Sequence, residues 1–417
     1  MKILVIGCGY VGLATGTCLA EAGNEVVCID KNAEKIAGLQ KGEMPINEPE
    51  LKDLVVKNLA AGKLEFGTDI VDAQVVICAV GTPTKEDGQA DLSDVFDVAK
   101  SVGEAVLGDY IFVMKSTVPV GTTLKCREFL KGNVVSNPEF LRQGAVIRDT
   151  MNPDRIVIGT ENKEDAEVMK SLYAPFTDEK RPMVFTDVAS AELSKYAANA
   201  FLSTKISFIN EMADLCGATG ANVKDVSKVM GLDSRIGPEF LRAGVGYGGG
   251  CLGKDNKSLV SQAQKVGINM GIIKAVELKN ENQKNIVMEK LTEHFGNLAG
   301  YTICILGLSF KPKTDDLRDA PSMEAVKKLL AAGAKIKVYD PVVSLGKENV
   351  VKASSLYEAA KDADAVLVMT EWDEFLNIDF DQLKNEMKGD LLIDGRNMFD
   401  PALVKKAGLK YIGVGVS

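Results

Sequence analysis

The sequence is poor in histidine, and this shortage limits the chemistry that the chain can perform. Its 417 residues include one histidine, His294, so a mechanism that needs an imidazole base together with an imidazole ligand is excluded. A metal site built on several imidazoles is excluded for the same reason. We therefore expect no metal, and we expect proton transfers to depend on carboxylates, lysines or a thiol.

Long apolar runs and paired cysteine motifs are also missing. No stretch is apolar over enough residues to span a bilayer, and the chain begins directly on the strand-like MKILVIG, so we expect neither a signal peptide nor a membrane anchor. The eight cysteines form no C-x-x-C pair, and Cys28, Cys78 and Cys304 lie in apolar strand-like runs. This usage is typical of a reducing compartment and indicates neither a disulfide framework nor a zinc site. We expect a cytoplasmic protein.

Basic blocks are absent as well, and the net charge of −9 argues against nucleic-acid binding. Hydrophobic content of 46% and charged content of 26% are ordinary for a globular protein. A chain of this length predicts two or three domains, each able to bury its own core.

Residues 2–30 read as a strand, a glycine turn, a helix and a second strand. The turn carries G-x-G-x-x-G at Gly7, Gly9 and Gly12, and Asp30 ends the second strand. In this position the glycines permit a tight turn and let a pyrophosphate approach the helix N-terminus. Asp30 can accept hydrogen bonds from the adenosine ribose and would repel a 2′-phosphate, which predicts NAD and not NADP. Lys35 is either a solvated helix charge or a cofactor contact.

The α/β alternation continues with buried strands at 75–83 and 110–122, which end in Gly-Thr-Pro and Ser-Thr turns. Such ends lie at the carboxyl edge of a parallel sheet, where ligands bind. Thr117 can reach a nicotinamide or a catalytic water, or it can simply start a helix. A third segment, 133–159, keeps polar residues beside apolar ones, and its Glu139 is a candidate for proton transfer.

A long helix over 190–220 is predicted by apolar residues at a spacing of three to four. Ser190 is a plausible N-cap, and Lys195 and Asn199 share one face because they are four residues apart. Little other charge lies on that face, which favours a site over a solvated surface. A helix of this length between two α/β halves indicates a spine and a dimer contact.

One glycine-rich stretch carries a thiol in a setting suited to catalysis. Five glycines fall between Gly246 and Gly253, and among them lies Cys251, followed by Lys254 and Asp255. Bare backbone allows a ligand to come close, and a nearby ammonium favours the nucleophilic thiolate. Asp255 can cap a helix or orient a water molecule. The alternative is a turn that holds an inert, buried cysteine.

A second α/β region begins at 301, with Asp340 in the position that Asp30 has in the first. It lacks a complete G-x-G-x-x-G, so two nucleotides are expected, one of which is not a dinucleotide. Lys311, Arg318 and Arg396 lie at or just after strand ends, where they can hold a diphosphate or form ordinary salt bridges. The predicted fold is α/β, with two Rossmann-like parallel-sheet domains joined by a long central helix and an all-helical middle region. The expected domains are 1–188 for NAD, 189–296 for helical dimerisation, and 297–417 for a nucleotide sugar.

Eight motifs occur in order along the whole chain: GxGYVG, KSTVPVGT, NPEFLR, AELSKYAANA, DSRIGPEFL, GYGGGCLGKD, GLSFKPKTDDLRDAPS and DGRN. As a set they resemble the UDP-glucose/GDP-mannose dehydrogenase family, and within it the UDP-glucose branch. The resemblance implies two NAD-dependent hydride transfers at C6 of UDP-glucose, which give UDP-glucuronate, in a homodimer or larger homo-oligomer. It also implies that Cys251 forms a thiohemiacetal and then a thioester, which water hydrolyses.

The resemblance assigns residues to three overlapping sets. The catalytic set is Cys251, Lys195, Asn199, Asp255, Thr117 and Glu139. The cofactor set is Gly7, Gly9, Tyr10, Val11, Gly12, Asp30, Lys35, Thr82, Thr117, Gln143, Lys254 and Arg318. The substrate set is Glu139, Phe140, Leu141, Arg142, Gln143, Lys195, Asn199, Arg235, Phe240, Leu241, Arg242, Ala243, Gly244, Gly248, Lys311 and Arg396. Within these sets, Lys195 and Asn199 stabilise oxyanions, and Arg235 reaches the partner subunit's site.

The sequence departs from the family pattern at two positions. Gln143 stands where a glutamate is usual and cannot act as a base, and Gly253 loosens the turn after Cys251. Three other activities compete with the main interpretation. GDP-mannose 6-dehydrogenase activity is the nearest, UDP-N-acetylhexosamine oxidation follows, and a non-catalytic nucleotide-sugar binding protein is disfavoured because the thiol, Lys195, Asn199 and Asp255 are all present.

Overall fold

The computed structural model describes residues 1–343, 345 and 350–416, and it divides into two compact units. The first consists of Met1–Ala198 with Lys257–Gly267, and the second of Asn199–Asn256 with Ile268–Ser417. Two helices, α8 (Val188–Thr219) and α10 (Leu252–Lys265), pass from one unit into the other. The helical middle region is therefore shared between the units, and the three-domain division at 188 and 296 stays a prediction.

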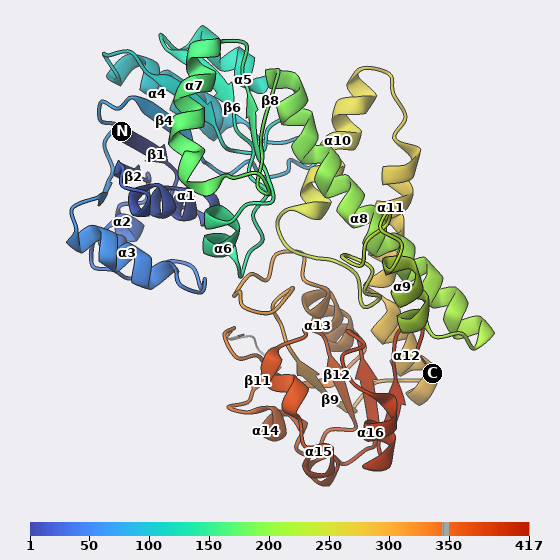
Figure 1. Ribbon diagram of the computed structural model, residues 1–417. Helices are drawn as coiled ribbons and strands as arrows, with labels where there is room; N and C mark the ends of the chain where they lie inside the picture. The colour runs from blue at the N-terminus through green and yellow to red at the C-terminus, as the bar shows by residue number, and fades with distance from the viewer. Residues whose placement is uncertain (344, 346–349, 417) are drawn as a thin grey trace. The chain divides into compact units, whose positions relative to one another are not determined.

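The first unit is built on an eight-stranded sheet with the order β3-β2-β1-β4-β5-β6-β7-β8 (Figure 1). Its strands are β1 (Lys2–Ile6), β2 (Glu25–Ile29), β3 (Leu64–Gly67), β4 (Val75–Cys78), β5 (Ile111–Met114), β6 (Asn133–Ser136), β7 (Ile156–Gly159) and β8 (Met183–Thr186). Strands β1 to β6 are parallel, and β7 joins β6 in the antiparallel direction. The strand order reverses between β1 and β4, which is the position where doubly wound sheets bind ligands.

Both faces of this sheet are covered, because alternate residues of each strand point to opposite sides. Ile3 and Val5 of β1 belong to a core with Leu13, whereas Leu4 belongs to a second core with Val95. The helices of the unit are α1 (Tyr10–Glu21), α2 (Ala33–Gln40), α3 (Leu51–Ala60), α4 (Ser93–Ala105), α5 (Thr122–Lys125), α6 (Val146–Met151) and α7 (Lys163–Tyr173), with 3₁₀ turns η1 (Cys126–Glu128) and η2 (Ala174–Phe176).

The second unit contains a six-stranded parallel sheet with the order β11-β10-β9-β12-β13-β14. These strands are β9 (Thr302–Leu306), β10 (Lys335–Tyr339), β11 (Val350–Lys352), β12 (Ala365–Val368), β13 (Leu391–Asp394) and β14 (Lys410–Ile412). The order matches that of β1 to β6, so the strand order reverses between β9 and β12, although all six strands are parallel. The unit also contains α9 (Val223–Gly231), α11 (Gly271–Gln283), α12 (Ile286–Phe295), α13 (Pro321–Ala331), η3 (Asp373–Asn377), α14 (Leu356–Ala360), α15 (Phe380–Glu386) and α16 (Pro401–Lys406).

The two sheets confirm the predicted α/β class with two Rossmann-like units and a helical middle region. One detail of the long helix was wrong, because α8 begins at Val188 and Ser190 lies inside it. The carboxylate of Asp187 accepts the Ser190 N–H at 2.8 Å, so Asp187 satisfies the first turn in place of the expected cap.

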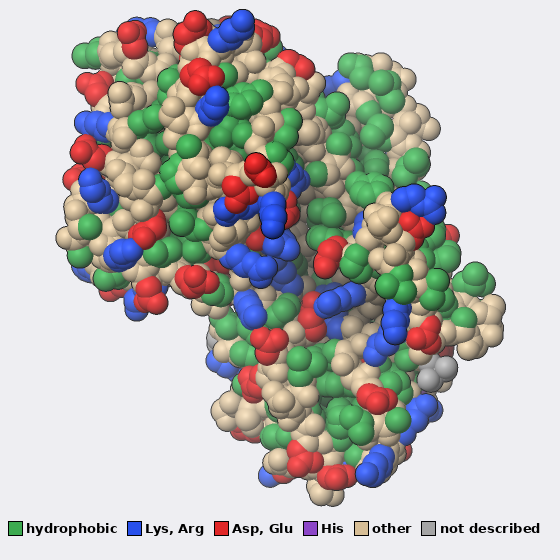
Figure 2. Space-filling view, viewed as in Figure 1, with side chains coloured by type: hydrophobic (Ala, Val, Ile, Leu, Met, Phe, Trp, Pro, Cys, Tyr) green, Lys and Arg blue, Asp and Glu red, His purple; other side chains and the backbone are tan. Residues whose placement is uncertain are grey.

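The surface of each unit mixes charges of both signs, as the face in Figure 2 shows. No helix within the described residues is long and apolar enough to cross a membrane. In the same part of the chain, no three His, Cys, Asp or Glu side chains gather as a metal-ligand set.

Candidate functional site

The glycine fingerprint lies in the turn between β1 and α1, as predicted. Gly7 has a φ of +102°, and a Cβ on Gly12 would lie 1.8 Å from the Gly7 carbonyl oxygen. Gly9, by contrast, has open space where a side chain would point. It is also the N-cap of α1, and no side chain caps this helix end. The turn therefore leaves room for a pyrophosphate beside the helix N-terminus, so these residues fit a dinucleotide.

Asp30 lies just beyond β2 and contacts the turn between β1 and α1. Its Oδ2 accepts the Cys8 N–H at 2.9 Å and the Lys35 ammonium at 2.8 Å. Burial raises the pKa of Asp30, but the hydrogen bonds from Lys35, Asn32 and Cys8 outweigh it, and the net pKa is lowered. Asp30 is therefore ionised, and Lys35 is held in an ion pair with this carboxylate.

The carboxyl ends of β4, β5 and β6 meet at one edge of the sheet. Thr82 donates to the carbonyl of Thr117 at 2.8 Å and thereby joins the loops after β4 and β5. Thr117 is partly exposed at this edge. The two threonines predicted to face the cofactor are thus brought together.

Glu139 is a buried carboxylate in the loop after β6. Its Oε1 lies 3.1 Å from the Lys195 ammonium, and its Oε2 accepts the Leu141 N–H at 2.5 Å. Burial raises the pKa of Glu139, but the ion pair with Lys195 and the hydrogen bonds outweigh it, so the pKa lies below its usual value. This ion pair places two predicted catalytic residues side by side inside the first unit.

The remaining residues of the Glu139 loop are also held by the first unit. Arg142 forms a bidentate pair with Asp149, with Nη2 to Oδ1 at 2.6 Å and Nε to Oδ2 at 2.9 Å. Glu48 accepts the N–H groups of Gly144 and Val146. Gln143 lies between these contacts, in the loop that precedes α6.

The eight cysteines fall into two groups by exposure, and none forms a disulfide. Seven are buried, and Cys251 is exposed. Burial raises the pKa of Cys8, Cys18 and Cys126 to about 12 and that of Cys78 to about 11. These thiols stay protonated and inert at neutral pH. Cys251 is exposed, so the alternative of an inert, buried cysteine does not apply to it.

Close approach of backbone explains the glycines before Cys251. A Cβ on Gly248 would lie 2.4 Å from the Asp319 carbonyl oxygen, and one on Gly249 would lie 2.8 Å from the Phe310 ring. A Cβ on Gly250 would lie 2.6 Å from Cζ of Arg318. The guanidinium of Arg318 therefore packs directly against the residue that precedes the thiol.

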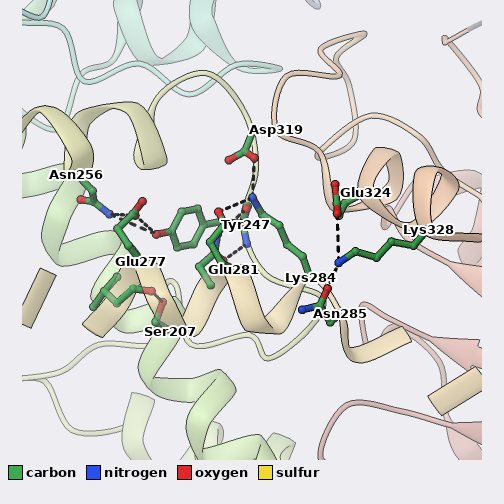
Figure 3. Close-up of polar contacts among 12 residues, drawn as sticks. Ser207, Tyr247, Asn256, Glu277, Glu281, Lys284, Asn285, Asp319, Glu324 and Lys328 are labelled. Carbon is green, nitrogen blue, oxygen red and sulfur yellow. Dashed lines mark hydrogen bonds and ion pairs between the residues drawn. The ribbon is translucent and has the colours of Figure 1, made fainter. Parts of the chain in front are cut away.

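Side chains from α11 hold this loop in place. The side chain of Asn280 makes two bonds to Tyr247, accepting its N–H at 2.9 Å and donating to its carbonyl at 3.1 Å. Gln283 donates to the Gly244 carbonyl at 2.7 Å. Figure 3 shows the phenol of Tyr247 pointing at Glu277, which accepts from Tyr247 at 2.6 Å and from Asn256 at 2.7 Å. Sequence reasoning missed these residues, because polar positions on an amphipathic helix look solvated.

The end of α11 holds a second loop next to the first. Lys284 is 4% exposed, and its ammonium lies 2.6 Å from Asp319 and 3.1 Å from Glu281 (Figure 3). Asp319 belongs to the loop that carries Lys311 and Arg318. One helix thus fixes both the thiol loop and a predicted substrate loop.

Asp255 follows Cys251 by one helical turn. Its N–H donates to the Cys251 carbonyl at 2.9 Å, so Asp255 lies inside α10 and the expectation that it caps this helix was wrong. The carboxylate accepts the Asn199 amide at 2.6 Å and lies 2.8 Å from the Lys254 ammonium. Asn199 and Asp255 therefore meet within the second unit, whereas Lys195 belongs to the first.

Arg396 connects the thiol loop with two other loops of the second unit. Its guanidinium donates to the carbonyls of Met369, Gly246 and Phe310 and lies 3.2 Å from Glu371. Lys311 follows Phe310, with its ammonium 5.5 Å from the centre of that ring. The loops after β9, β12 and β13 thus converge with the thiol loop.

A cavity of about 320 Å³ opens beside Arg396 in the second unit. It brings together the predicted residues Leu241, Arg242, Ala243 and Arg396 with others that the sequence did not single out, namely Val223, Lys224, Ser227, Glu371, Asn397 and Met398. Three cations in one cavity suit a diphosphate. Glu371 lies in the loop that follows β12, so the strand-end rule could have found it.

Two other predicted residues, Phe240 and Arg235, shortly precede the cavity residue Leu241 in the sequence. Phe240 adopts a φ of 63°, which is unusual for a bulky residue and indicates a constrained loop. The side chain of Arg235 is 87% exposed and pairs with Asp233 at 2.5 Å. Arg235 is therefore available to a second molecule.

The second Rossmann-like unit repeats the carboxylate of the first but binds it differently. Oδ2 of Asp340 accepts the N–H groups of Leu308 and Ser309 and the indole N–H of Trp372. These donors come from the protein itself, in the position where Asp30 would meet a ribose. In the second unit this carboxylate is therefore already satisfied by the protein's own donors.

The first unit carries the glycine fingerprint of a dinucleotide site, the second has the same strand order, and Cys251 is an exposed thiol. Together these features define a nicotinamide-dinucleotide-dependent dehydrogenase. Residues 1–177, 189–282 and 304–401 match the NAD binding domain, the central domain and the UDP binding domain of one family. The chain belongs to the UDP-glucose/GDP-mannose dehydrogenase family.

Individual relatives agree over the full length. The chain is 46% identical to a UDP-glucose 6-dehydrogenase of Rhizobium meliloti, covering 100% of this chain and 99% of that protein. It is 43% identical to the UDP-glucose 6-dehydrogenase of Pseudomonas aeruginosa, with 100% and 97% covered. The solved structure of a UDP-glucose dehydrogenase from Pyrobaculum islandicum has a TM-score of 0.92 at 33% identity, with 100% and 98% covered.

Proposed function

We propose that this chain oxidises UDP-glucose to UDP-glucuronate with NAD. The observation that carries the proposal is the exposure of a single cysteine, Cys251, at the start of α10, in a chain whose full-length relatives bear that activity. A helix N-terminus favours a thiolate, and so does the packing of the Arg318 guanidinium against Gly250.

The proposed chemistry uses Cys251 as the nucleophile. Its sulfur adds to the C6 aldehyde, and loss of hydride from the resulting thiohemiacetal gives a thioester, which water cleaves to the acid and the free thiol. Lys195 and Asn199 stabilise the oxyanions. Asp255, Thr117 and Glu139 place and deprotonate the water, and the ionised state of Glu139 suits it to accept a proton.

The proposed cofactor set begins with the turn after β1. The backbone of this turn would hold the pyrophosphate, Asp30 the ribose, and the loops that contain Thr82, Thr117 and Gln143 the nicotinamide end. NAD supplies the hydride acceptor when it is bound. Lys254 and Arg318 belong to the same proposed set.

UDP-glucose would occupy the second unit, with its diphosphate near Arg242 and Arg396. The cavity at these residues and the constrained loop from Phe240 to Gly244 support this assignment. Phe140, Leu141, Arg142, Lys311 and Gly248 complete the proposed substrate set.

An assay with several nucleotide sugars tests the function. With NAD and UDP-glucose, we expect two NADH per sugar and UDP-glucuronate as the product. Turnover with GDP-mannose alone would replace the proposal with its nearest rival, and sugar binding without NADH would indicate a non-catalytic protein. NADP should support far less turnover, because Asp30 is ionised.

We also propose a homodimer or larger homo-oligomer formed through α8. Phe201, Phe208 and Leu215 recur about every second turn on this helix and are 66%, 44% and 57% exposed. Arg235 would then reach the site of the second subunit.

A charge on this apolar face is expected to separate the subunits. Phe208→Glu should shift the protein to monomers in size-exclusion chromatography with light scattering, because association would bury an unpaired carboxylate. Leu403→Glu is the matched control, since Leu403 on α16 is 57% exposed and lies on another surface element. A wild-type protein that is monomeric at assay concentration would contradict the proposal.

Two further statements remain proposals. The division into an NAD domain, a helical domain and a UDP-sugar domain at 188 and 296 rests on the change of pattern in the sequence. A cytoplasmic location rests on the cysteine usage, and no membrane or nucleic-acid partner is proposed.

A further inference from the structure

Lys115 is a buried lysine with few protein partners. It follows β5 at the carboxyl edge of the sheet and is 8% exposed. An ammonium has three N–H donors, and the acceptor that the described residues give it is Oδ1 of Asn137 at 3.0 Å. The same oxygen also accepts the Tyr173 hydroxyl at 2.6 Å. Such a group is costly to bury unless something else satisfies it.

The neighbouring cavity offers those missing partners. Lys115 lines a space of about 50 Å³ together with Asn137, Glu139 and Tyr173. A water needs roughly 10–15 Å³ of such space and two to four polar partners, so the cavity has room for a short water chain. The rest of its polar lining consists of the charged residues Asp149, Asp154 and Arg155 and the neutral residues Thr15, Thr150 and Asn152. Lys115 and Glu139 thus open onto one water-sized space.

The charges around this space favour exchange of a proton by Lys115. Burial lowers the pKa of Lys115 to about 8, with Lys195 acting in the same direction and Glu139 opposing it. Of the other groups that face it, the Tyr173 hydroxyl stays protonated because burial raises its pKa. Near neutral pH the amine can therefore exist in both protonation states.

We propose that Lys115 relays protons between Glu139 and the water of this cavity during turnover. The inference rests on the proposed role of Glu139, because each hydride taken from C6 leaves a proton that the site must remove. In the relay, the O–H bond of the protonated Glu139 breaks, its electron pair stays on the carboxylate, and the proton passes through a water of the cavity to form an N–H bond on neutral Lys115. The ammonium then returns the proton to cavity water and so to solvent.

The pH dependence of kcat gives the first test. Because the relay accepts a proton as the neutral amine, wild-type kcat should rise as the pH rises through about 8. Lys115→Met should lower kcat about a hundredfold, change the KM for UDP-glucose less than threefold, and lose that rise. Lys115→Arg should be equally slow, because a guanidinium keeps its proton. Full activity and a normal pH profile in Lys115→Arg would show that a fixed cation suffices and would overturn the relay.

Chemical rescue gives the second test and does not depend on how Lys115→Met folds. Lys115→Ala leaves space for ethylamine or for the similar but far less basic 2,2,2-trifluoroethylamine. Rescue that follows amine basicity supports a relay, and equal rescue by both supports mere filling of space. Thermal unfolding and NADH binding check that the variants are folded.

A third variant, Glu139→Gln, distinguishes failure of the relay from failure of the proposed function. If Glu139→Gln is slow while Lys115→Met keeps the wild-type rate, the relay is wrong and the function stands. If the wild type makes no NADH from UDP-glucose, the proposed function itself fails.

Discussion

Cys251→Ser is expected to abolish net formation of UDP-glucuronate, with a loss of at least about a thousandfold in kcat. A serine hydroxyl is a far weaker nucleophile than a thiolate, so the covalent intermediate does not form at a useful rate. UDP-glucose binding should stay nearly intact, because the substituted atom contributes little to holding the nucleotide. NADH formation and isothermal titration with UDP-glucose measure the two quantities separately.

A second cysteine provides the control for this prediction. Cys216 lies in α8 and is 5% exposed, so Cys216→Ala should keep a near wild-type rate with a modest loss of stability. A Cys251→Ser protein that produced glucuronate at the wild-type rate would rule out the thioester route and leave a dehydrogenase of another mechanism.

Gly248→Ala is expected to inactivate the enzyme without touching any reacting group. The new Cβ would lie 2.4 Å from the Asp319 carbonyl oxygen and 3.0 Å from Cα of Ala320, and backbone atoms cannot rotate away. The thiol loop must therefore shift, at a cost of about 1–3 kcal/mol in the free energy of unfolding. A 1 Å displacement of a reacting atom can itself reduce the rate about a hundredfold.

The matched control lies five residues further along the chain. Gly253 is inside α10, and its Cβ would meet Oδ2 of Asp319 at 3.4 Å, an ordinary contact. Gly253→Ala should therefore stabilise the helix by roughly 0.5–1 kcal/mol. Thermal unfolding, kcat and the alkylation rate of Cys251 should separate the two variants, and identical behaviour would refute the argument from close packing.

The features that could be predicted from the sequence are those that depend on residues close together in the chain. The G-x-G-x-x-G turn, the apolar strands and the strand-end positions of Thr117 and Glu139 follow from backbone sterics and from the topology of parallel sheets. The exposure of Cys251 followed less directly, because a glycine-rich turn is compatible with either burial or exposure.

The features that could not be predicted depend on contacts between segments that are far apart in the sequence. Asn280 and Gln283 bind the thiol loop from a helix more than thirty residues away, and only the folded chain shows that these side chains are buried. Lys115 was passed over because a lysine after a strand usually reaches solvent. Asp187 and Ser190 are both residue types that cap helices, and the helix starts three residues earlier than a cap at Ser190 would require.

The passage of α8 and α10 between the two units determines how the chain can be divided. The first unit needs residues from 1–198 and from 257–267, so no single uninterrupted stretch contains it. The third crossing, after 267, lies between α10 and α11, but the other two, at 198 and 256, fall within hydrogen-bonded helices. A gene cut at either crossing therefore yields polypeptides that each lack part of a core, and expressing one unit alone requires joining distant pieces of the coding sequence.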